Sequence, residues 1–436
     1  MSAAPPRHPW QVFAVVAAGT FMATLDSSIV NVALPTLART FHAPVTAIEW
    51  VSLAYLLSLT LLLLPFGRLA DALGRRRVYL AGVVLFTIGS GLCAAAPSLA
   101  LLIAARVVQG VGAAMVSANG IAIVTASFPA EIRGRALGWI GATVGIGLTV
   151  GPPLGGWLIE LGSWRTIFLV NLPIGVVLTA AGVSLLPRDE RAAEGGTAAA
   201  RREPLVNFGA FRNPVFASST ATLFLAFVSL FAAVFLVPFY LERVAGQTPG
   251  EVGRVLVVIP LLLSLVSPVS GALSDRLGSR ALATFGLLLT GAGLLLLAAF
   301  IGREPGHSPG LVAVLGSLFV VGLGQGLFQP PNSSAAMGAV PATRLGFAGG
   351  LLATMRNLGM LCGIGLAAAI YEGRELAHIG RVGGGAIETT RAAAALGVRD
   401  ALLVAAAIAV LASFVALARG SERRREDTLD ASRVAR

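Results

Sequence analysis

The chain of 436 residues contains no lysine, only 4 histidines and only 2 cysteines, and just 12% of its residues are charged. A soluble protein of this size needs many charged residues on the surface that faces water, and this chain has too few of them. Both cysteines, Cys93 and Cys362, lie in apolar runs, so the sequence predicts neither a disulfide framework nor a metal site. The net charge of +11 comes from arginines, most of which stand in short loops between apolar runs, so we expect no nucleic-acid partner.

Sequence motifs of soluble enzymes and of ATP-driven pumps are missing too. The chain has no Gly-x-Ser-x-Gly, no His-Glu-x-x-His, no Walker phosphate loop and no Cys-x-x-Cys. We therefore expect a protein that is not an enzyme and holds no cofactor. If it moves a solute, the energy must come from an ion gradient or from the gradient of the solute itself.

The sequence is rich in long apolar runs, since 56% of it is hydrophobic and its mean hydropathy is +0.83. Twelve runs of about 20 residues are each long enough to cross a hydrocarbon core roughly 30 Å thick. The sequence therefore predicts an all-α integral membrane protein in the lipid bilayer of the plasma (inner) membrane. Its twelve transmembrane helices are expected near 11–37, 46–66, 78–96, 99–124, 136–159, 166–186, 214–241, 255–271, 281–301, 311–332, 346–371 and 401–418.

A charged stretch divides these runs into two six-helix halves. We predict an N-terminal half (1–186), a cytoplasmic linker (187–213), a C-terminal half (214–419) and a cytoplasmic tail (420–436). Cytoplasmic N- and C-termini follow from the positive-inside rule, because they put most arginines in cytoplasmic loops. The outer loop at 372–400 contains three consecutive glycines and is expected to be weakly structured.

One loop motif occurs twice, after the second and after the eighth run. Such an internal repeat is typical of transporters whose binding site lies between two halves. Its glycines are expected to let the chain turn tightly, and its arginines to stay at the anionic cytoplasmic leaflet. A loop that only fixes topology is the alternative. The residues are Gly67, Asp71, Gly74, Arg75 and Arg76 in the first copy and Gly271, Asp275 and Gly278 in the second.

Asp26 lies near the middle of the first span, where an ionised carboxylate costs several kcal/mol and is usually functional. No other carboxylate lies deep in a span, so Asp26 is the residue expected to load and unload a proton, and we expect it to face a cavity. The alternative is an aspartate permanently paired with an arginine. Arg106 in span four shares one helix face with Gln109 and Gly110 and needs a partner, as does Arg356 in span eleven. Arg356 could bind substrate, balance Asp26 or serve packing.

Two more spans have unusual composition. Span five has a glycine stripe with two prolines, which lets helices approach closely and bends the helix, although generic tight packing is a rival interpretation. Span ten is polar and rich in proline, which favours a broken helix lining the transport pathway. The residues singled out are Gly147, Gly151, Pro152, Gly155 and Gly156 in span five, and Gln325, Gln329 and Asn332 in span ten.

These motifs together resemble the major facilitator superfamily, and within it the drug:proton antiporters. The span-one segment from Leu25 to Pro35, with Asp26 and Asn31, resembles a motif of their fourteen-span branch, although two central spans are missing here. The resemblance implies that the repeated loops act as a conformational latch and that Arg106 assists proton transfer. It further implies that the Gly-Pro pattern of span five accompanies export, and that the protein is a monomer.

The sequence thus favours a proton-coupled secondary transporter that exports small, largely apolar organic molecules by alternating access. Its partners would be a small-molecule substrate, protons and the bilayer. An uptake symporter or facilitator for a metabolite is the alternative within transport. A membrane sensor that keeps the fold without transporting is the alternative outside it.

Overall fold

The computed structural model describes residues 9–128, 130–187, 211–303, 310–340, 345–379 and 386–419. Most of these residues are helical, and none of them is in a strand. The predicted linker and tail fall mostly outside them. In chain order the helices are α1 (Pro9–Phe41), α2 (Val45–Ile48), α3 (Trp50–Leu73), α4 (Arg75–Ala95), α5 (Leu99–Ser127), α6 (Ala130–Leu161), α7 (Thr166–Leu169), α8 (Asn171–Leu185), α9 (Pro214–Arg243), α10 (Pro249–Leu256), α11 (Val258–Leu277), α12 (Ser279–Arg303), α13 (Leu311–Gly338), α14 (Leu345–Ile379) and α15 (Ala386–Leu417).

The prediction of twelve spans is confirmed, because the described residues contain 12 helical segments long and apolar enough to cross a membrane. Three of these spans are each built from two consecutive helices: α2 with α3, α7 with α8, and α10 with α11. The eighth span also begins earlier than predicted, at Pro249. The side chain of Thr248 accepts from the Glu251 N–H and the Glu251 side chain accepts from the Thr248 N–H, a capping box that starts the helix there.

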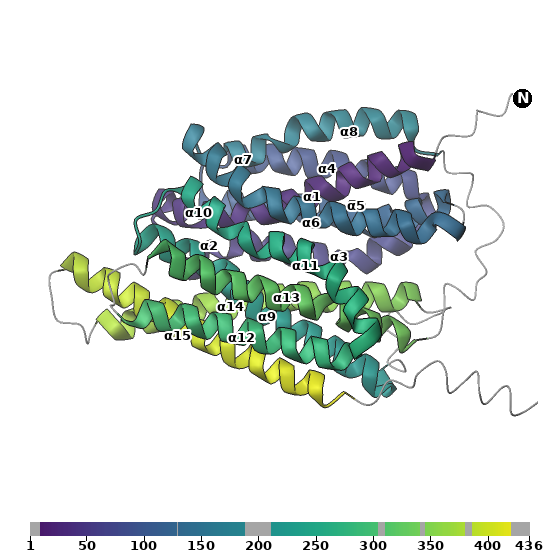
Figure 1. Cartoon of the computed structure of the whole chain (residues 1–436). Coiled ribbons are helices and arrows are strands. Elements are labelled where there is room, and N and C mark those ends of the chain that lie inside the picture. The colour runs from purple at the N-terminus through teal and green to yellow at the C-terminus, as the bar shows by residue number, and fades with distance from the viewer. Residues whose placement is uncertain are drawn as a thin grey trace, which may run out of the picture.

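The helices run roughly along one common axis, and the two halves of the chain lie side by side (Figure 1). Helices α1, α4, α5, α7 and α8 fill the upper part of that view, and α9, α12, α14 and α15 fill the lower part. Between the halves, α6 packs against α10 and α11, and α3 packs against α14. The contact surface between the halves is therefore made by a few helices from each.

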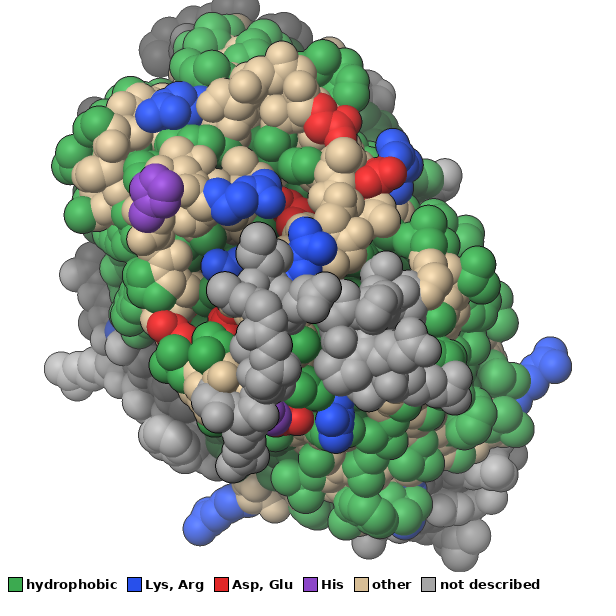
Figure 2. All heavy atoms as spheres, turned by 90° about the vertical axis from the view of Figure 1, so that its left-hand side faces the viewer, with side chains coloured by type: hydrophobic (Ala, Val, Ile, Leu, Met, Phe, Trp, Pro, Cys, Tyr) green, Lys and Arg blue, Asp and Glu red, His purple; other side chains and the backbone are tan. Residues whose placement is uncertain are grey.

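At the end of the bundle that carries α2, α7 and α10, polar groups join the two halves. Arg39 Nη2 donates to Glu242 Oε2 at 2.6 Å, and the Gly250 N–H donates to Glu160 Oε1 at 3.0 Å. The Thr46 N–H donates to Glu372 Oε2 of α14 at 3.3 Å. Figure 2 looks onto this end and shows acidic and basic side chains gathered near the middle of the face. We call it the closed end, and the opposite end, where α3 meets α4 and α11 meets α12, the loop end.

Two expectations about loops were wrong. Gly67, expected in a turn, lies inside α3, so the turn is made at Gly74 alone, whose φ of 100° favours glycine; Gly278 is its equivalent in the repeat, with φ 85°. The outer loop at 372–400 is largely helical, since α14 continues to Ile379 and α15 begins at Ala386. Asp400 of α15 holds these ends together, because its Oδ2 lies 3.1 Å from His378 Nε2 and 3.6 Å from Arg374 Nε, both on α14. The glycine run of that loop lies outside the described residues.

Candidate functional site

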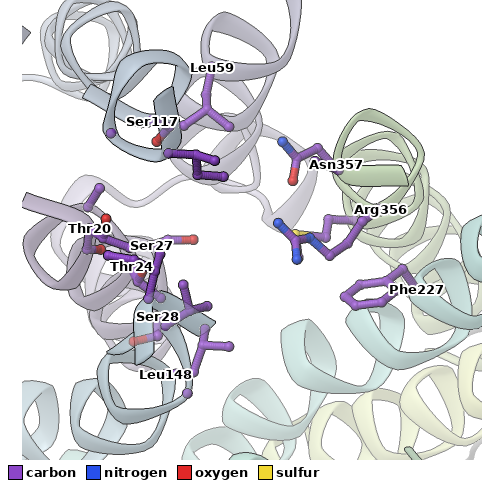
Figure 3. Close-up of a pocket in the computed structure, with 18 of the residues that line it drawn as sticks. Thr20, Thr24, Ser27, Ser28, Leu59, Ser117, Leu148, Phe227, Arg356 and Asn357 are labelled. Atoms are coloured by element: carbon purple, nitrogen blue, oxygen red, sulfur yellow. The ribbon is translucent and has the colours of Figure 1, made fainter. Parts of the chain in front are cut away.

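A cavity of about 1510 Å³ lies between the two halves. Helices α1, α3, α5 and α6 face it from one half, and α9, α11, α13 and α14 from the other (Figure 3). The cavity extends to the loop end, where Gly67, Arg68 and Arg75 line it. None of the residues joined by the closed-end contacts is among its lining. The structure is therefore open toward the loop end and shut at the closed end.

Among the described residues that line the cavity, the charged ones are all arginines. Arg68 and Arg75 stand at the loop end, and Arg356 of α14 stands deeper, beside Asn357. Among the described lining residues there is no aspartate or glutamate. Most of the remaining wall is apolar, with Phe227 and Leu59 among the side chains drawn in Figure 3. The cavity thus combines apolar surface with positive charge.

Asp26 and Arg106 form a buried ion pair inside the N-terminal half. Arg106 Nη1 lies 2.6 Å from Asp26 Oδ2, and the two residues are 1% and 0% exposed. Arg106 Nε donates to the Val51 carbonyl oxygen at 2.8 Å, and Nη1 also donates to Gln109 Oε1 at 2.6 Å. A buried ion pair is stable only when further hydrogen bonds support both partners, and both Asp26 and Arg106 form such bonds. Arg356 is not part of this pair, so Arg106 is the partner that the sequence left open.

Asn171 and Ser90, which sequence analysis missed, complete the network. Asn171 Nδ2, at the start of α8, donates to Asp26 Oδ1 at 2.9 Å, and Gln109 Nε2 donates to the same oxygen at 2.8 Å. Both amides also donate to Ser90 Oγ of α4, at 3.0 and 3.1 Å. Asp26 therefore accepts three hydrogen bonds from three different side chains. Its pairing joins α1, α4, α5 and α8 in one polar cluster.

Close helix packing places this cluster. A Cβ on Gly89 of α4 would lie 2.8 Å from the backbone nitrogen of Gln109, so α4 and α5 touch where Ser90 meets Gln109. Gly110 makes the matching approach on the other side of α5, because a Cβ there would lie 2.6 Å from the Tyr55 carbonyl oxygen. Small residues that let helix backbones approach are the usual means of bringing intramembrane polar groups together.

The expectation that Asp26 faces the cavity was wrong, because a wall separates them. Tyr55 and Ala23 line the cavity, and the Tyr55 hydroxyl donates to the Ala23 carbonyl oxygen at 3.2 Å. The Arg106 guanidinium carbon lies 4.2 Å from the centre of the Tyr55 ring, on the far side of that wall. Asp26 points into the N-terminal half because its donors come from α5 and α8, and the neighbouring Ser27 points into the cavity instead (Figure 3).

The cavity face of α1 is polar. Thr20, Thr24, Ser27 and Asn31 all line the cavity and follow one another at intervals of three or four residues, which places them on one helix face. Pro35, the last residue of the span-one motif, is buried within α1. Of this row the sequence analysis named only Asn31, although its helical spacing inside an apolar run was a signal that could have identified it.

The glycine stripe of α6 packs against α1. A Cβ on Gly151 would overlap Ser28 Oγ, one on Gly155 would lie 2.7 Å from Ile29 Cγ1, and one on Gly147 would lie 3.0 Å from a side chain of α1. Ser28 Oγ also donates to the Gly147 carbonyl oxygen at 3.1 Å. The stripe therefore brings together two helices of the same half.

A second face of α6 packs against the other half. A Cβ on Gly156 would overlap the Pro249 carbonyl oxygen, and a Cβ on Gly253 of α10 would overlap the Pro152 carbonyl oxygen. The backbones of α6 and α10 are thus in direct contact near the closed end. Pro152 also lines the cavity, so this helix links the cavity wall with the contact between the halves.

The two copies of the loop motif lie at the loop end. Gly74 and Gly278 end α3 and α11 with the same left-handed backbone, which explains why both copies have glycine there. Arg75 begins α4 and lines the cavity, and Arg76 Nη2 donates to the Val183 carbonyl oxygen of α8 at 2.5 Å. Gly271 has open space around it. The side chains of Asp71 and Asp275 lie outside the described part of the chain, so the proposed latch remains a prediction.

Span ten does not have the form expected from its sequence. α13 is one continuous helix with Pro330 inside it, and of the three polar residues named only Gln329 lines the cavity. Gln325 donates to Thr290 Oγ1 of α12 at 3.4 Å. Asn332 donates to the Ser219 carbonyl oxygen of α9 at 3.0 Å and accepts from Arg419. These two side chains hold neighbouring helices together because their hydrogen-bond partners lie within the C-terminal half.

Comparison with known proteins gives consistent matches along the chain. The sequence model of the Major Facilitator Superfamily matches residues 16–364 and 244–433. The riboflavin transporter RibZ of Clostridioides difficile is 33% identical over 409 residues, which are 84% of this chain and 89% of that protein. The multidrug resistance protein Stp of Mycobacterium tuberculosis is 33% identical over 402 residues, 81% of this chain and 74% of that protein. The tetracenomycin C resistance and export protein of Streptomyces glaucescens is 27% identical and covers 84% of this chain.

A solved structure shows the same fold. The bacterial homologue of the human lysosomal transporter Spinster, in an inward-facing and unoccupied conformation, superposes with a TM-score of 0.76. The match covers 97% of this chain and all of that one at 18% sequence identity. At this identity the likeness concerns the fold alone.

Proposed function

Because the chain belongs to the major facilitator superfamily and is a membrane transporter, we propose that it exports small organic molecules by alternating access, driven by protons. The observation that carries this proposal is the Asp26–Arg106 pair, which is buried at depth behind Tyr55 and Ala23 of the cavity wall. A scaffold protein gains little from such a pair, since burying two charges costs several kcal/mol per ion before pairing repays it.

In this proposal α1 couples the proton to the substrate. Asp26 and Ser27 are adjacent on α1 but point in different directions, one into the polar cluster and the other into the cavity. Protonation of Asp26 would remove its charge from the pair with Arg106 and weaken the hydrogen bonds that hold α1 against α5 and α8. A shift of α1 would then move the polar row that faces the substrate. Proton binding and substrate binding would thereby favour different conformations.

The direction of transport depends on topology. With both termini in the cytoplasm, as the arginine distribution predicts, the loop end faces the cytoplasm, and a substrate would enter the open cavity from inside the cell. The proposed site of action is the plasma (inner) membrane, with the chain working as a monomer. The paired loops containing Gly74 and Gly278 would approach each other when the cavity closes at that end.

A second candidate function is uptake or facilitated movement of a metabolite. The specific observation in its favour is the relative named a riboflavin transporter, which is as similar to this chain as the relative named a multidrug resistance protein. A cavity of about 1510 Å³ accommodates a molecule of either kind, since ligand pockets commonly measure about 300–1,000 Å³.

The test is accumulation of fluorescent compounds in cells that lack their own exporters. Three probes of similar size would be compared: riboflavin, the anion fluorescein, and a cationic rhodamine with the same ring core as fluorescein. Cells would express the unaltered protein, Asp26→Asn, or the control Asp400→Asn, whose carboxylate forms partly exposed ion pairs. Each measurement would be repeated with a protonophore.

The sign of the change separates the two functions. Lower accumulation with the unaltered protein and with Asp400→Asn, abolished by the protonophore and by Asp26→Asn, supports proton-coupled export. Higher accumulation of riboflavin instead supports uptake, and insensitivity to the protonophore would identify a facilitator. If no probe changes although all proteins reach the membrane, export of drug-like molecules in general is refuted.

A further inference from the structure

The charge pattern of the central cavity points to a class of substrate. We infer that the cavity binds organic anions, with Arg356 as the residue that receives the anionic group. The inference rests on the proposed function in one respect, because it takes this cavity as the transport site.

Arg356 is a cation that protein carboxylates do not neutralise. In the described part of the chain it forms no ion pair, and its Nε is buried without a hydrogen-bond partner. Arg106, the other arginine deep in a span, differs in every respect: it has a carboxylate, an amide and a carbonyl oxygen as partners. An intramembrane guanidinium is costly unless it is paired, so a single unpaired one beside a cavity indicates a partner that comes and goes.

No acidic side chain lies among the described residues that share the cavity with Arg356. The described residues lining the cavity include Arg68 and Arg75 at its mouth and no acidic side chain. The carboxylate of Asp26, which lies deep in a span as Arg356 does, is already paired with Arg106 and lies behind Tyr55. Beside Arg356, a cationic ligand would therefore meet like charge and, among the described lining residues, no carboxylate. An anionic ligand would be attracted by Arg356, and a cleft lined by one sign of charge concentrates ions of the opposite sign.

The geometry also indicates what the rest of the ligand looks like. Figure 3 shows Arg356 and Asn357 directed into the cavity from α14, with Phe227 of α9 beside them and Thr24 and Ser27 across the gap. A guanidinium presents several donors in a plane, which suits carboxylate, sulfonate or phosphate groups. An aromatic side chain next to it suits a flat apolar body. The expected ligand is an aromatic anion with one acidic group at its edge.

Binding to the purified full-length protein tests this inference separately from transport. Fluorescence anisotropy would follow fluorescein and the matching cationic rhodamine in nanodiscs of uncharged lipid. The variants are Arg356→Met, which removes the charge, and Arg356→Lys, which keeps it. Arg374→Met is the matched control, because Arg374 lies on the same helix but is 57% exposed and outside the cavity.

We expect fluorescein to bind more tightly than the rhodamine. Arg356→Met should weaken fluorescein binding at least about tenfold, as loss of one partner in a desolvated charge pair does. Arg356→Lys should cost less, and Arg374→Met nothing. Rhodamine binding equal to or tighter than that of fluorescein, no binding of either dye, or unchanged fluorescein affinity in Arg356→Met would each overturn the inference. Proton-coupled export of the rhodamine in the cell assay would then leave the proposed function standing without it.

Discussion

Replacement of Asp26 by asparagine should destabilise the fold as well as abolish coupling. The carboxylate accepts hydrogen bonds from Arg106 at 2.6 Å, Gln109 at 2.8 Å and Asn171 at 2.9 Å. An asparagine side chain offers one acceptor oxygen and an NH2 group, which must face one of these donors. Arg106 would also lose its counter-charge while remaining 1% exposed.

The expected cost is about 3–5 kcal/mol, the range measured when one partner of a buried ion pair is removed. Most of that cost belongs to the charge left on Arg106, so the double variant Asp26→Asn/Arg106→Gln should recover part of it. We expect an interaction energy of about 2–3 kcal/mol in the double-mutant cycle. The recovered stability should not restore proton-driven transport, because the carboxylate proposed to carry the proton is gone.

The assay is unfolding of the purified protein in mild detergent, followed by tryptophan fluorescence against temperature and denaturant. Asp400→Asn is the control: its carboxylate is 20% exposed and its arginine partner 57% exposed, and such pairs contribute about 0–1 kcal/mol. Asp26→Asn as stable as Asp400→Asn, or a double variant no more stable than Asp26→Asn alone, would refute the view that this pair is a strong buried interaction.

Two further perturbations follow from helix packing and from the closed end. Gly151→Val places a branched side chain where even a Cβ overlaps Ser28 Oγ, so we expect a loss of at least about 1–3 kcal/mol, seen as a lower yield of monodisperse protein and a lower melting temperature. Arg39→Ala leaves the buried Glu242 without its cation and should destabilise the contact between the halves at the closed end by about 1.5–3 kcal/mol. We expect the closed end to open more often, which would be seen as longer distances between spin labels at the outer ends of α1 and α9.

Matched variants separate these effects from general disturbance. Gly365→Val adds the same side chain on α14 where a Cβ meets open space, and should leave the melting temperature nearly unchanged. Arg374→Ala breaks a more exposed ion pair at the same end of the bundle, within one half, and should not alter the label distances. Equal loss of stability in Gly365→Val, or an unchanged distance distribution in Arg39→Ala, contradicts the respective reasoning.

The sequence predicted the spans well because apolar length is a local property. Each of the twelve runs can be recognised from its own residues, without knowledge of its neighbours. Gly74 and Gly278, in the two copies of the loop motif, mark turns whose backbone only glycine adopts readily. Junctions inside a span were not predictable in this way. Glu49, the residue between α2 and α3, keeps right-handed helical backbone angles, which most residue types adopt readily. The amino-acid composition therefore does not mark the point where α2 ends and α3 begins.

Parts of the candidate site escaped sequence analysis because they depend on orientation. Asp26 and Ser27 differ by one position, yet one is sealed in a polar cluster and the other faces the cavity. Hydropathy says how deep a residue lies but not which neighbour it meets. Asn171 joins Asp26 from 145 positions away along the chain, and Asn332 looks like a pathway residue until its partner Ser219 is known.

The two glycine faces of α6 imply that substitutions on this one helix fall into two genetic classes. Gly151 and Gly155 contact α1 within a half, so side chains added there lower the amount of folded protein in the membrane. Gly156 contacts α10 across the halves, so a side chain added there would interfere with a contact that changes if transport proceeds by the proposed alternating access. Alleles of the first class would show reduced abundance, whereas an allele at Gly156 would give normal abundance with slowed turnover. A single turn of helix thus separates defects of folding from defects of motion.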